Sequence, residues 1–208
     1  MSLALLVVAA LGLTVVAVGP GTLPWDVAIA LRVQRVPAAV GAPLARVGYW
    51  AGSAAVVYAV GAALIVLLGR RQLRREVAVL AGVLIVRALN TPLKVLVASP
   101  RPIDGQVLIS ELATGNGFPS GHMFGATLLY GAVIWIAARL VPSRPARWAI
   151  QGIAAMLIAV TGFDRIYSGA HWPSDVLGGL LWGLVGLLAV ILVSGRLVPD
   201  GQPLEGKA

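Results

Sequence analysis

The sequence contains no cysteine, only two histidines and only eight acidic residues among its 208 positions. The missing cysteines exclude disulfide bonds and thiolate metal sites. Charged residues make up 12% of the chain and hydrophobic residues 59%, whereas a soluble domain has about a quarter of its residues charged. With a mean hydropathy of +0.91, the chain is too apolar for a water-soluble globule. The composition predicts a polytopic, all-α membrane protein.

Basic residues outnumber acidic ones, and the formal net charge is +8. Charge of this sign suits a nucleic-acid partner, but the basic clusters here flank apolar runs. Membrane proteins collect Lys and Arg in their cytoplasmic loops. We therefore expect the chain to be partnered by a lipid bilayer and not by nucleic acid.

Six apolar runs predict six transmembrane helices, because a span needs about 20 apolar residues. The runs are Leu3–Val18, Val47–Leu68, Val77–Val97, His122–Leu140, Trp148–Gly162 and Asp175–Val193. The first run is closed by Gly19, Pro20 and Gly21. We expect one membrane domain over residues 1–196 and a polar cytoplasmic tail over residues 197–208.

A seventh segment, Trp25–Val36, has a different pattern. Its apolar residues share one helical face: Trp25, Ile29, Val33 and Val36. Asp26 and Arg35 lie off that face. This pattern is typical of a helix that lies in the membrane interface, so an interfacial helix is expected between the first and second spans. An ordinary polar connection is the alternative.

The third span carries charge. Arg87, Asn90 and Lys94 follow each other at i, i+3 and i+7, so they share one face of a helix. Charged groups inside a span face protein or a water-filled cavity. For Arg87, near the middle of the span, we expect a structural role in which it pairs with Asn90 or with a backbone carbonyl.

The positions of the arginines predict the orientation of the chain. One cluster follows the second span, at Arg70, Arg71, Arg74 and Arg75. Another surrounds the turn after the fourth span, at Arg139, Arg144 and Arg147. Both turns should be cytoplasmic, which places both termini in the cytoplasm. Three polar segments then meet at the external face of the cell membrane: 94–102, 119–122 and 165–175.

These three segments contain groups that bind anions. Lys94, Arg101 and Arg165 have few acidic neighbours in the sequence, and guanidinium and ammonium groups suit phosphate oxygens. Ser120 stands at the expected N-cap of the fourth span, and Gly121 lets the backbone approach a ligand closely. A helix N-terminus attracts anions. The external face is therefore expected to bind a phosphate or another oxyanion.

The two histidines add catalytic chemistry. His171 and Asp175 lie four residues apart, so that a carboxylate can fix the tautomer of the imidazole and leave its other nitrogen nucleophilic. His122 can protonate a leaving oxygen and later activate water. Taken singly, each group has a plainer role: an interfacial histidine, a headgroup anchor or a helix cap. Their predicted meeting at one face favours a phosphoryl-transfer site without a metal or other cofactor.

Three motifs then become recognisable: Lys94-x6-Arg101-Pro102, Pro119-Ser120-Gly121-His122 and Arg165-x5-His171-x3-Asp175. In their order and spacing they resemble the signature of the type 2 phosphatidic acid phosphatase (PAP2) superfamily. That superfamily includes lipid phosphatases, glucose-6-phosphatases and vanadium haloperoxidases. The motifs extend from Lys94 to Asp175, and the six-span layout extends the likeness over most of the chain.

The resemblance implies a role for each residue. His171 would form a phosphohistidine, Asp175 would orient it, and His122 would be the general acid. The remaining residues would hold the phosphate: Lys94, Arg101, Ser120, Gly121 and Arg165. The third motif of the family usually begins with Ser-Arg, whereas here Asp164 precedes Arg165. This carboxylate could repel the phosphate, brace Arg165 or point away from the site.

The expected function is metal-independent hydrolysis of a lipid phosphate monoester or diphosphate at the external membrane face. Phosphatidate, phosphatidylglycerophosphate and polyprenyl phosphates or diphosphates all fit. The polar loop Ile103–Pro119 would be a lid or a rim of the site. A phosphatase for small soluble esters is one alternative, and a non-catalytic lipid-binding or flipping protein is another. The sequence does not predict the oligomeric state.

Overall fold

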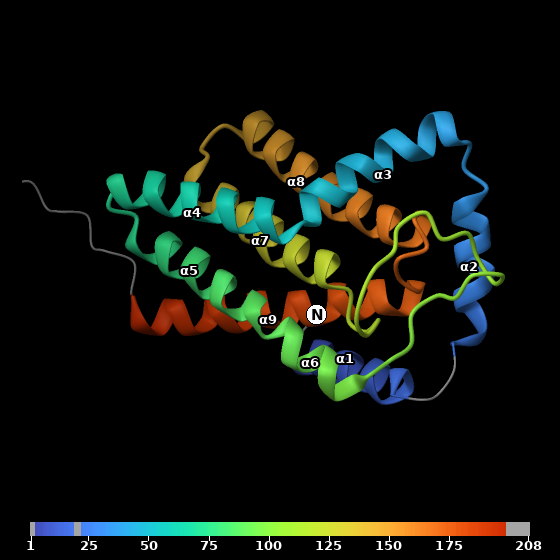
Figure 1. Ribbon diagram of the computed structural model, residues 1–208. Coiled ribbons are helices and arrows are strands. Elements are labelled where there is room, and N and C mark those ends of the chain that lie inside the picture. The colour runs from blue at the N-terminus through green and yellow to red at the C-terminus, as the bar shows by residue number, and fades with distance from the viewer. Residues whose placement is uncertain (1–2, 19–21, 199–208) are drawn as a thin grey trace, which may run out of the picture.

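The computed structural model describes residues 3–18 and 22–198, which form α-helices joined by short turns and one long loop (Figure 1). The helices are α1 (Leu3–Ala17), α2 (Pro24–Gln34), α3 (Ala38–Gly52), α4 (Ala54–Arg70), α5 (Arg74–Ala88), α6 (Asn90–Val97), α7 (Gly121–Leu140), α8 (Arg144–Tyr167) and α9 (Pro173–Leu197). The described residues contain no β-strand, which confirms the all-α prediction. The predicted closing residues 19–21 and most of the predicted tail, residues 199–208, lie outside the described residues.

Four segments are long and apolar enough to cross a membrane: Arg74–Val97, Gly121–Leu140, Arg144–Tyr167 and Pro173–Leu197. The bent pair α2–α3 would make a fifth. The apolar helices α1 and α4 have 15 and 17 residues, and at about 1.5 Å per residue neither reaches the roughly 30 Å of a bilayer core. An integral membrane protein is supported, and the count of six spans stays a prediction.

The predicted second span, Val47–Leu68, is broken in the structure. α3 ends at Gly52 and α4 begins at Ala54, because Ser53 takes an extended conformation and caps α4 by accepting a hydrogen bond from the Val56 amide (3.3 Å). A Cβ at Gly52 would lie 2.9 Å from His122 Cβ. The break thus brings the chain close to the start of α7.

The predicted third span, Val77–Val97, starts earlier and is also interrupted. α5 begins at Arg74, and Leu89 separates it from α6. The interruption comes shortly before Pro92, which has no amide hydrogen to donate within a helix. Arg87 and Lys94 therefore belong to two consecutive helices. Both side chains nevertheless line the same cavity.

α7 lies in the middle of the bundle, where it contacts α3, α4, α5, α8 and α9. Its buried side chains pack with those of neighbouring helices in the largest apolar cluster, which includes Val79, Val83, Leu128, Leu129 and Leu187. Because α7 is buried along most of its length, its N-terminal end is held firmly. The predicted phosphate-binding residues Ser120 and Gly121 stand at that end.

Two glycines let α9 approach this end of α7. A Cβ at Gly179 would lie 2.7 Å from Ser120 O, and a Cβ at Gly178 would overlap the Phe118 ring. Small residues permit such close helix packing in membranes. Consecutive glycines in the sixth predicted span are therefore explained by packing against the site.

α2 runs across the end of the bundle (Figure 1), and the α2–α3 pair is bent by 116°. Its predicted apolar face is partly exposed, with Trp25 at 50% and Ile29 at 39%. Asp26, on the other side of α2, is buried and accepts hydrogen bonds from the Ser174 amide (2.9 Å) and hydroxyl (2.8 Å). This arrangement suits the predicted interfacial helix, with α2 tied to the start of α9.

The two arginine-rich turns lie at one end of the bundle, and the long loop 98–120 and α2 lie at the other (Figure 1). Thus the turns α4–α5 and α7–α8 face the same side, as the six-span prediction requires. The N-terminal ends of α7 and α9 meet the long loop at the opposite end. That end contains the candidate site.

Candidate active site

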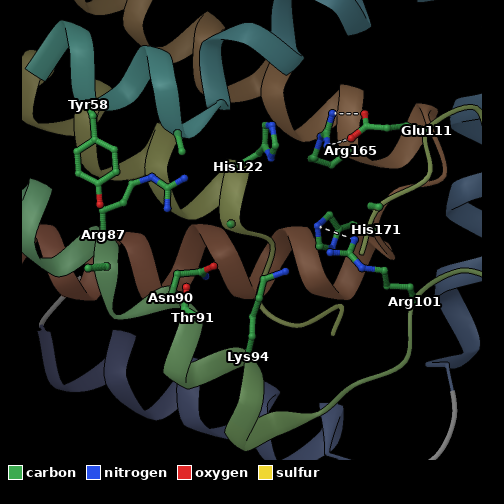
Figure 2. A pocket seen from close by; sticks show the side chains of 14 residues that line it. Tyr58, Arg87, Asn90, Thr91, Lys94, Arg101, Glu111, His122, Arg165 and His171 are labelled. Carbon is green, nitrogen blue, oxygen red and sulfur yellow. Dashed lines mark hydrogen bonds and ion pairs between the residues drawn. The ribbon is translucent and has the colours of Figure 1, made fainter. Parts of the chain in front are cut away.

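A cavity of about 540 Å³ opens beside the N-terminal end of α7 (Figure 2). Six of the eight predicted site residues line it: Lys94, Arg101, Gly121, His122, Arg165 and His171. The other two stand behind them, where Asp175 contacts His171 (3.2 Å) and the Ser120 amide donates to the Asp175 carbonyl (3.0 Å). Residues up to 81 positions apart in the sequence are thus gathered at one place.

Ser120 is the N-cap residue of α7, as predicted. Its side chain is fully buried, and its hydroxyl oxygen has no hydrogen-bond partner among the described residues. Buried polar atoms in proteins are usually satisfied. Behind Gly121, a Cβ would lie 2.8 Å from Asn90 Oδ1, so a larger residue there would have to displace the Asn90 side chain. The exposed helix N-terminus beside an unsatisfied hydroxyl suits an anionic ligand.

His171 is held between a carboxylate and a cation. Its Nδ1 lies 3.2 Å from Asp175 Oδ2, and its Nε2 lies 3.2 Å from an Arg101 nitrogen. A guanidinium can only donate, so Nε2 must accept and Nδ1 must carry the hydrogen that is given to Asp175. The same Asp175 oxygen accepts from the Trp172 amide (3.0 Å). The tautomer with a nucleophilic lone pair on Nε2 is therefore favoured.

The electrostatics of His171 favour the neutral imidazole. The ring is buried, and burial, followed by the positive charge of Arg101, lowers the pKa of His171 well below its usual value. A neutral imidazole keeps the lone pair that nucleophilic attack requires. His171 is thus available for attack at neutral pH.

His122 lies in the first turn of α7 and faces the same cavity (Figure 2). The ring of Tyr49 lies beside it, with 5.3 Å between the ring centroids. His122 Nε2 is buried and has no hydrogen-bond partner among the described residues. This atom is therefore free to exchange a proton with a group bound in the cavity.

Lys94 and Arg101 are oriented by backbone carbonyls of the long loop and, for Arg101, also of the turn between α8 and α9. Lys94 Nζ donates to Asn116 O (2.9 Å), and Arg101 donates to the carbonyls of Gly115, Thr114 and Ala170 at 2.6–3.0 Å. These hydrogen bonds fix the positions of both cationic side chains relative to the long loop. Both cationic groups still line the cavity.

Arg165 is almost completely buried and bound by two carboxylates. Its Nε lies 2.7 Å from Asp164 Oδ2, and its terminal nitrogens donate to both Glu111 oxygens at 3.0 and 2.8 Å. Of the three alternatives for Asp164, the structure favours bracing of Arg165. Asp164 faces a second cavity, beside Arg46 and Tyr167, and does not line the first.

Two contacts at the site involve residues outside the predicted set, Glu111 and Asp26. No local pattern in the sequence connects Glu111 with Arg165, 54 positions away. Asp26 lies off the apolar face of its predicted helix, where a carboxylate is ordinarily solvated, so nothing in the sequence indicates its buried contact with Ser174.

Arg87 differs from the prediction that it pairs with Asn90 or a carbonyl. Among the described residues it forms no such hydrogen bond, and its Nε is buried without a partner. Asn90 instead donates to the Pro119 carbonyl (3.4 Å). Within the same described residues, no three His, Asp or Glu side chains gather as a metal ion would require.

The structural likeness to solved proteins is extensive. A transmembrane PAP2-type phosphatidylglycerolphosphate phosphatase from Bacillus subtilis superposes with a TM-score of 0.76. The alignment covers 96% of this chain and 98% of that one, at 21% sequence identity. At this identity the likeness concerns the fold alone.

Curated relatives share parts of the sequence. Phosphatidylglycerophosphatase B of Bacillus subtilis is 34% identical over 113 residues, or 52% of this chain and 51% of that protein. Lipid A 1-phosphatase of Rhizobium johnstonii is 36% identical over 95 residues, or 43% of this chain and 35% of that protein. The chain thus matches about half, or less, of the length of these relatives.

The family comparison covers more of the chain. The PAP2 superfamily matches residues 75–198, which is more than half of the sequence and includes all three motifs. The same range contains the histidine–aspartate pair and all the cavity-lining residues except Ala54 and Tyr58. The chain therefore belongs to the PAP2 superfamily.

Proposed function

We propose that this protein is an integral-membrane phosphatase that hydrolyses a lipid phosphate monoester or diphosphate. The observation that carries the proposal is the cavity in which His122 and His171 meet three cationic side chains, those of Lys94, Arg101 and Arg165. The described residues, 3–18 and 22–198, have little mass outside the helices and one loop, which favours a substrate that approaches from the bilayer. The names of the relatives, which include a phosphatidylglycerophosphatase and a lipid A phosphatase, agree with such a substrate.

The first step transfers the phosphoryl group to the protein. His171 Nε2 attacks phosphorus, the new P–N bond forms, and the bond from phosphorus to the leaving oxygen breaks. His122 Nε2 gives its proton to that oxygen, so the lipid leaves as a neutral hydroxyl or, from a diphosphate, as a monophosphate. Asp175 stabilises the positive imidazole that forms on His171.

The second step restores the protein. His122, now neutral, takes a proton from a water molecule whose oxygen attacks the phosphohistidine. The P–N bond breaks, inorganic phosphate leaves, and His171 is free again. The cationic groups and the N-terminal amides of α7 stabilise the charge on the phosphoryl oxygens in both steps. In this mechanism His171 is the nucleophile, His122 is the acid, and the cationic groups form the anion site.

The proposed orientation places this site on the external face of the cell membrane and both termini in the cytoplasm. Eight arginines at the opposite end of the bundle support it, because cytoplasmic ends collect basic residues. They are Arg70, Arg71, Arg74, Arg75, Arg139, Arg144, Arg147 and Arg196.

The test measures phosphate release by the detergent-solubilised protein with EDTA present. Substrates are phosphatidate, phosphatidylglycerophosphate, a polyprenyl monophosphate and diphosphate, and a water-soluble ester. We expect His171→Ala to abolish turnover and His122→Ala to lower kcat about 10²- to 10⁴-fold, the usual contribution of a general acid. Full activity of His171→Ala would contradict the phosphohistidine mechanism. Equal or better hydrolysis of the soluble ester would contradict a lipid substrate.

A further inference from the structure

The cavity continues beyond the two histidines into the membrane-spanning part of the bundle. Its far wall is formed by Tyr58, Arg87, Asn90 and Thr91, none of which belongs to the three motifs. Figure 2 shows Arg87 pointing into the cavity from the side opposite to Arg101 and Arg165. One cation therefore lies apart from the three that surround the histidines.

Arg87 has no acidic partner among the described residues. Its guanidinium carbon lies 5.8 Å from the centroid of the Tyr58 ring, and its Nε is buried without a hydrogen bond. A charged side chain within a membrane span is costly unless it is paired or has a functional role. The side chain is thus positioned to bind an anion that enters the cavity.

α7 makes room for this guanidinium. A Cβ at Gly125 would lie 2.5 Å from Arg87 Nε and 2.9 Å from its Cδ, so a larger residue at position 125 would force the Arg87 side chain to shift. Gly125 follows His122 by three residues, less than one helical turn. Arg87 therefore lies on the side of the general acid, where the leaving group of the substrate would be placed.

We infer that Arg87 recognises a second phosphate group, carried by the leaving part of the substrate. This inference rests on the proposed function, since it extends the same cavity. A polyprenyl diphosphate carries the second phosphate directly on the leaving oxygen. Phosphatidylglycerophosphate carries it beyond a glycerol unit, as a phosphodiester. Phosphatidate, whose leaving group is an uncharged diacylglycerol, has no anion for Arg87.

The experiment compares kcat/KM of the wild type and Arg87→Gln on these three lipids, in the same detergent. We expect a loss of roughly 10- to 100-fold on the substrate with the second phosphate, as for one charged hydrogen-bonding partner, and a change of less than about threefold on phosphatidate. If kcat/KM falls only for the polyprenyl diphosphate, the group that Arg87 binds is a phosphate attached directly to the leaving oxygen. If it falls only for phosphatidylglycerophosphate, the group is the phosphodiester beyond the glycerol unit. Equal losses on all three lipids, or none, overturn the inference.

Three further variants test whether the loss is specific to Arg87 or a general effect of the substitution. Gly125→Ala displaces the guanidinium without removing it and should reproduce the selective loss. Arg144→Gln removes an exposed arginine far from the cavity and should change none of the three activities. Arg87→Lys keeps the charge and should retain part of the preference, whereas a purely structural Arg87 would give no substrate dependence in any variant.

Binding of inorganic pyrophosphate to His171→Ala, which lacks the proposed nucleophile, gives a readout that does not depend on turnover. Isothermal titration of His171→Ala should show tighter binding of pyrophosphate than of phosphate, and adding Arg87→Gln should lower that preference at least about tenfold. An unchanged preference in the double variant contradicts the inference even if the protein hydrolyses lipids. Absence of all lipid hydrolysis by the wild type, with the pyrophosphate preference intact, contradicts the proposed function instead.

Discussion

At the scale of single residues, Glu111 occupies the donors of Arg165 that the proposed substrate would use. Both carboxylate oxygens of Glu111 accept from the terminal nitrogens of Arg165, at 3.0 and 2.8 Å, and these are the donors that a phosphate would use. The Glu111 side chain is 29% exposed, and it reaches the site from the long loop. Asp164, by contrast, is buried and accepts hydrogen bonds from Nε and one terminal nitrogen of the same guanidinium.

The variant Glu111→Gln should therefore bind substrate more tightly. It removes the competing charge but keeps the shape of the side chain, and a partly exposed ion pair is worth about 1 kcal/mol. We expect KM to fall about fivefold with little change in kcat, as measured by initial rates on a lipid phosphate. Asp104→Asn, a charge removal at an exposed position of the same loop, is the control. An unchanged or higher KM for Glu111→Gln would mean that Glu111 does not compete.

At the scale of elements, α2 holds the start of α9 through Asp26. This carboxylate accepts hydrogen bonds from the Leu23 and Ser174 amides and from the Ser174 hydroxyl. Ser174 immediately precedes Asp175, the residue that orients His171. α2 thus braces the histidine–aspartate pair, although none of its residues lines the cavity.

Asp26→Ala should weaken both the fold and the catalytic step. Because the change leaves the buried Ser174 donors without an acceptor, we expect the free energy of unfolding to fall by about 1–3 kcal/mol. kcat should fall more than KM changes, since Asp175 loses its fixed position. Thermal unfolding in detergent and steady-state kinetics measure the two effects. Asp104→Ala should alter stability by less than about 0.5 kcal/mol, and equal behaviour of the two variants would disprove the brace.

At the scale of the whole molecule, the proposed orientation makes opposite predictions for the two ends of the bundle. The chain has no cysteine, so single-cysteine variants can be labelled without background. Leu112, which is 94% exposed, lies in the long loop next to the site. Arg71 is exposed in the turn between α4 and α5.

In intact cells, a membrane-impermeant maleimide should label Leu112→Cys and not Arg71→Cys. After permeabilisation, Arg71→Cys should react as well, because the reagent then reaches the cytoplasmic end. The reverse pattern would place the site in the cytoplasm. Labelling of both variants in intact cells would contradict a bundle whose two ends lie on opposite sides of the membrane.

Much of the site could be predicted from the sequence, because its residues stand in three short motifs. His171 and Asp175 are one helical turn apart, and Ser120 and Gly121 directly precede an apolar run, so local geometry alone orients them. The helix boundaries were less accurate. The break at Ser53 was missed because the run Val47–Leu68 is apolar throughout, and hydropathy does not detect a residue that leaves the helix to act as a cap.

The sequence by itself determined the membrane-embedded all-α class, the family motifs and the eight candidate site residues, since these depend on composition and on short spacings. Only the tertiary structure decided the partners of the charged groups. Glu111 meets Arg165, Asp26 meets Ser174, and Arg87 meets no carboxylate among the residues described. Contacts between side chains far apart in the chain depend on how helices pack and where they break, and no local pattern encodes that packing.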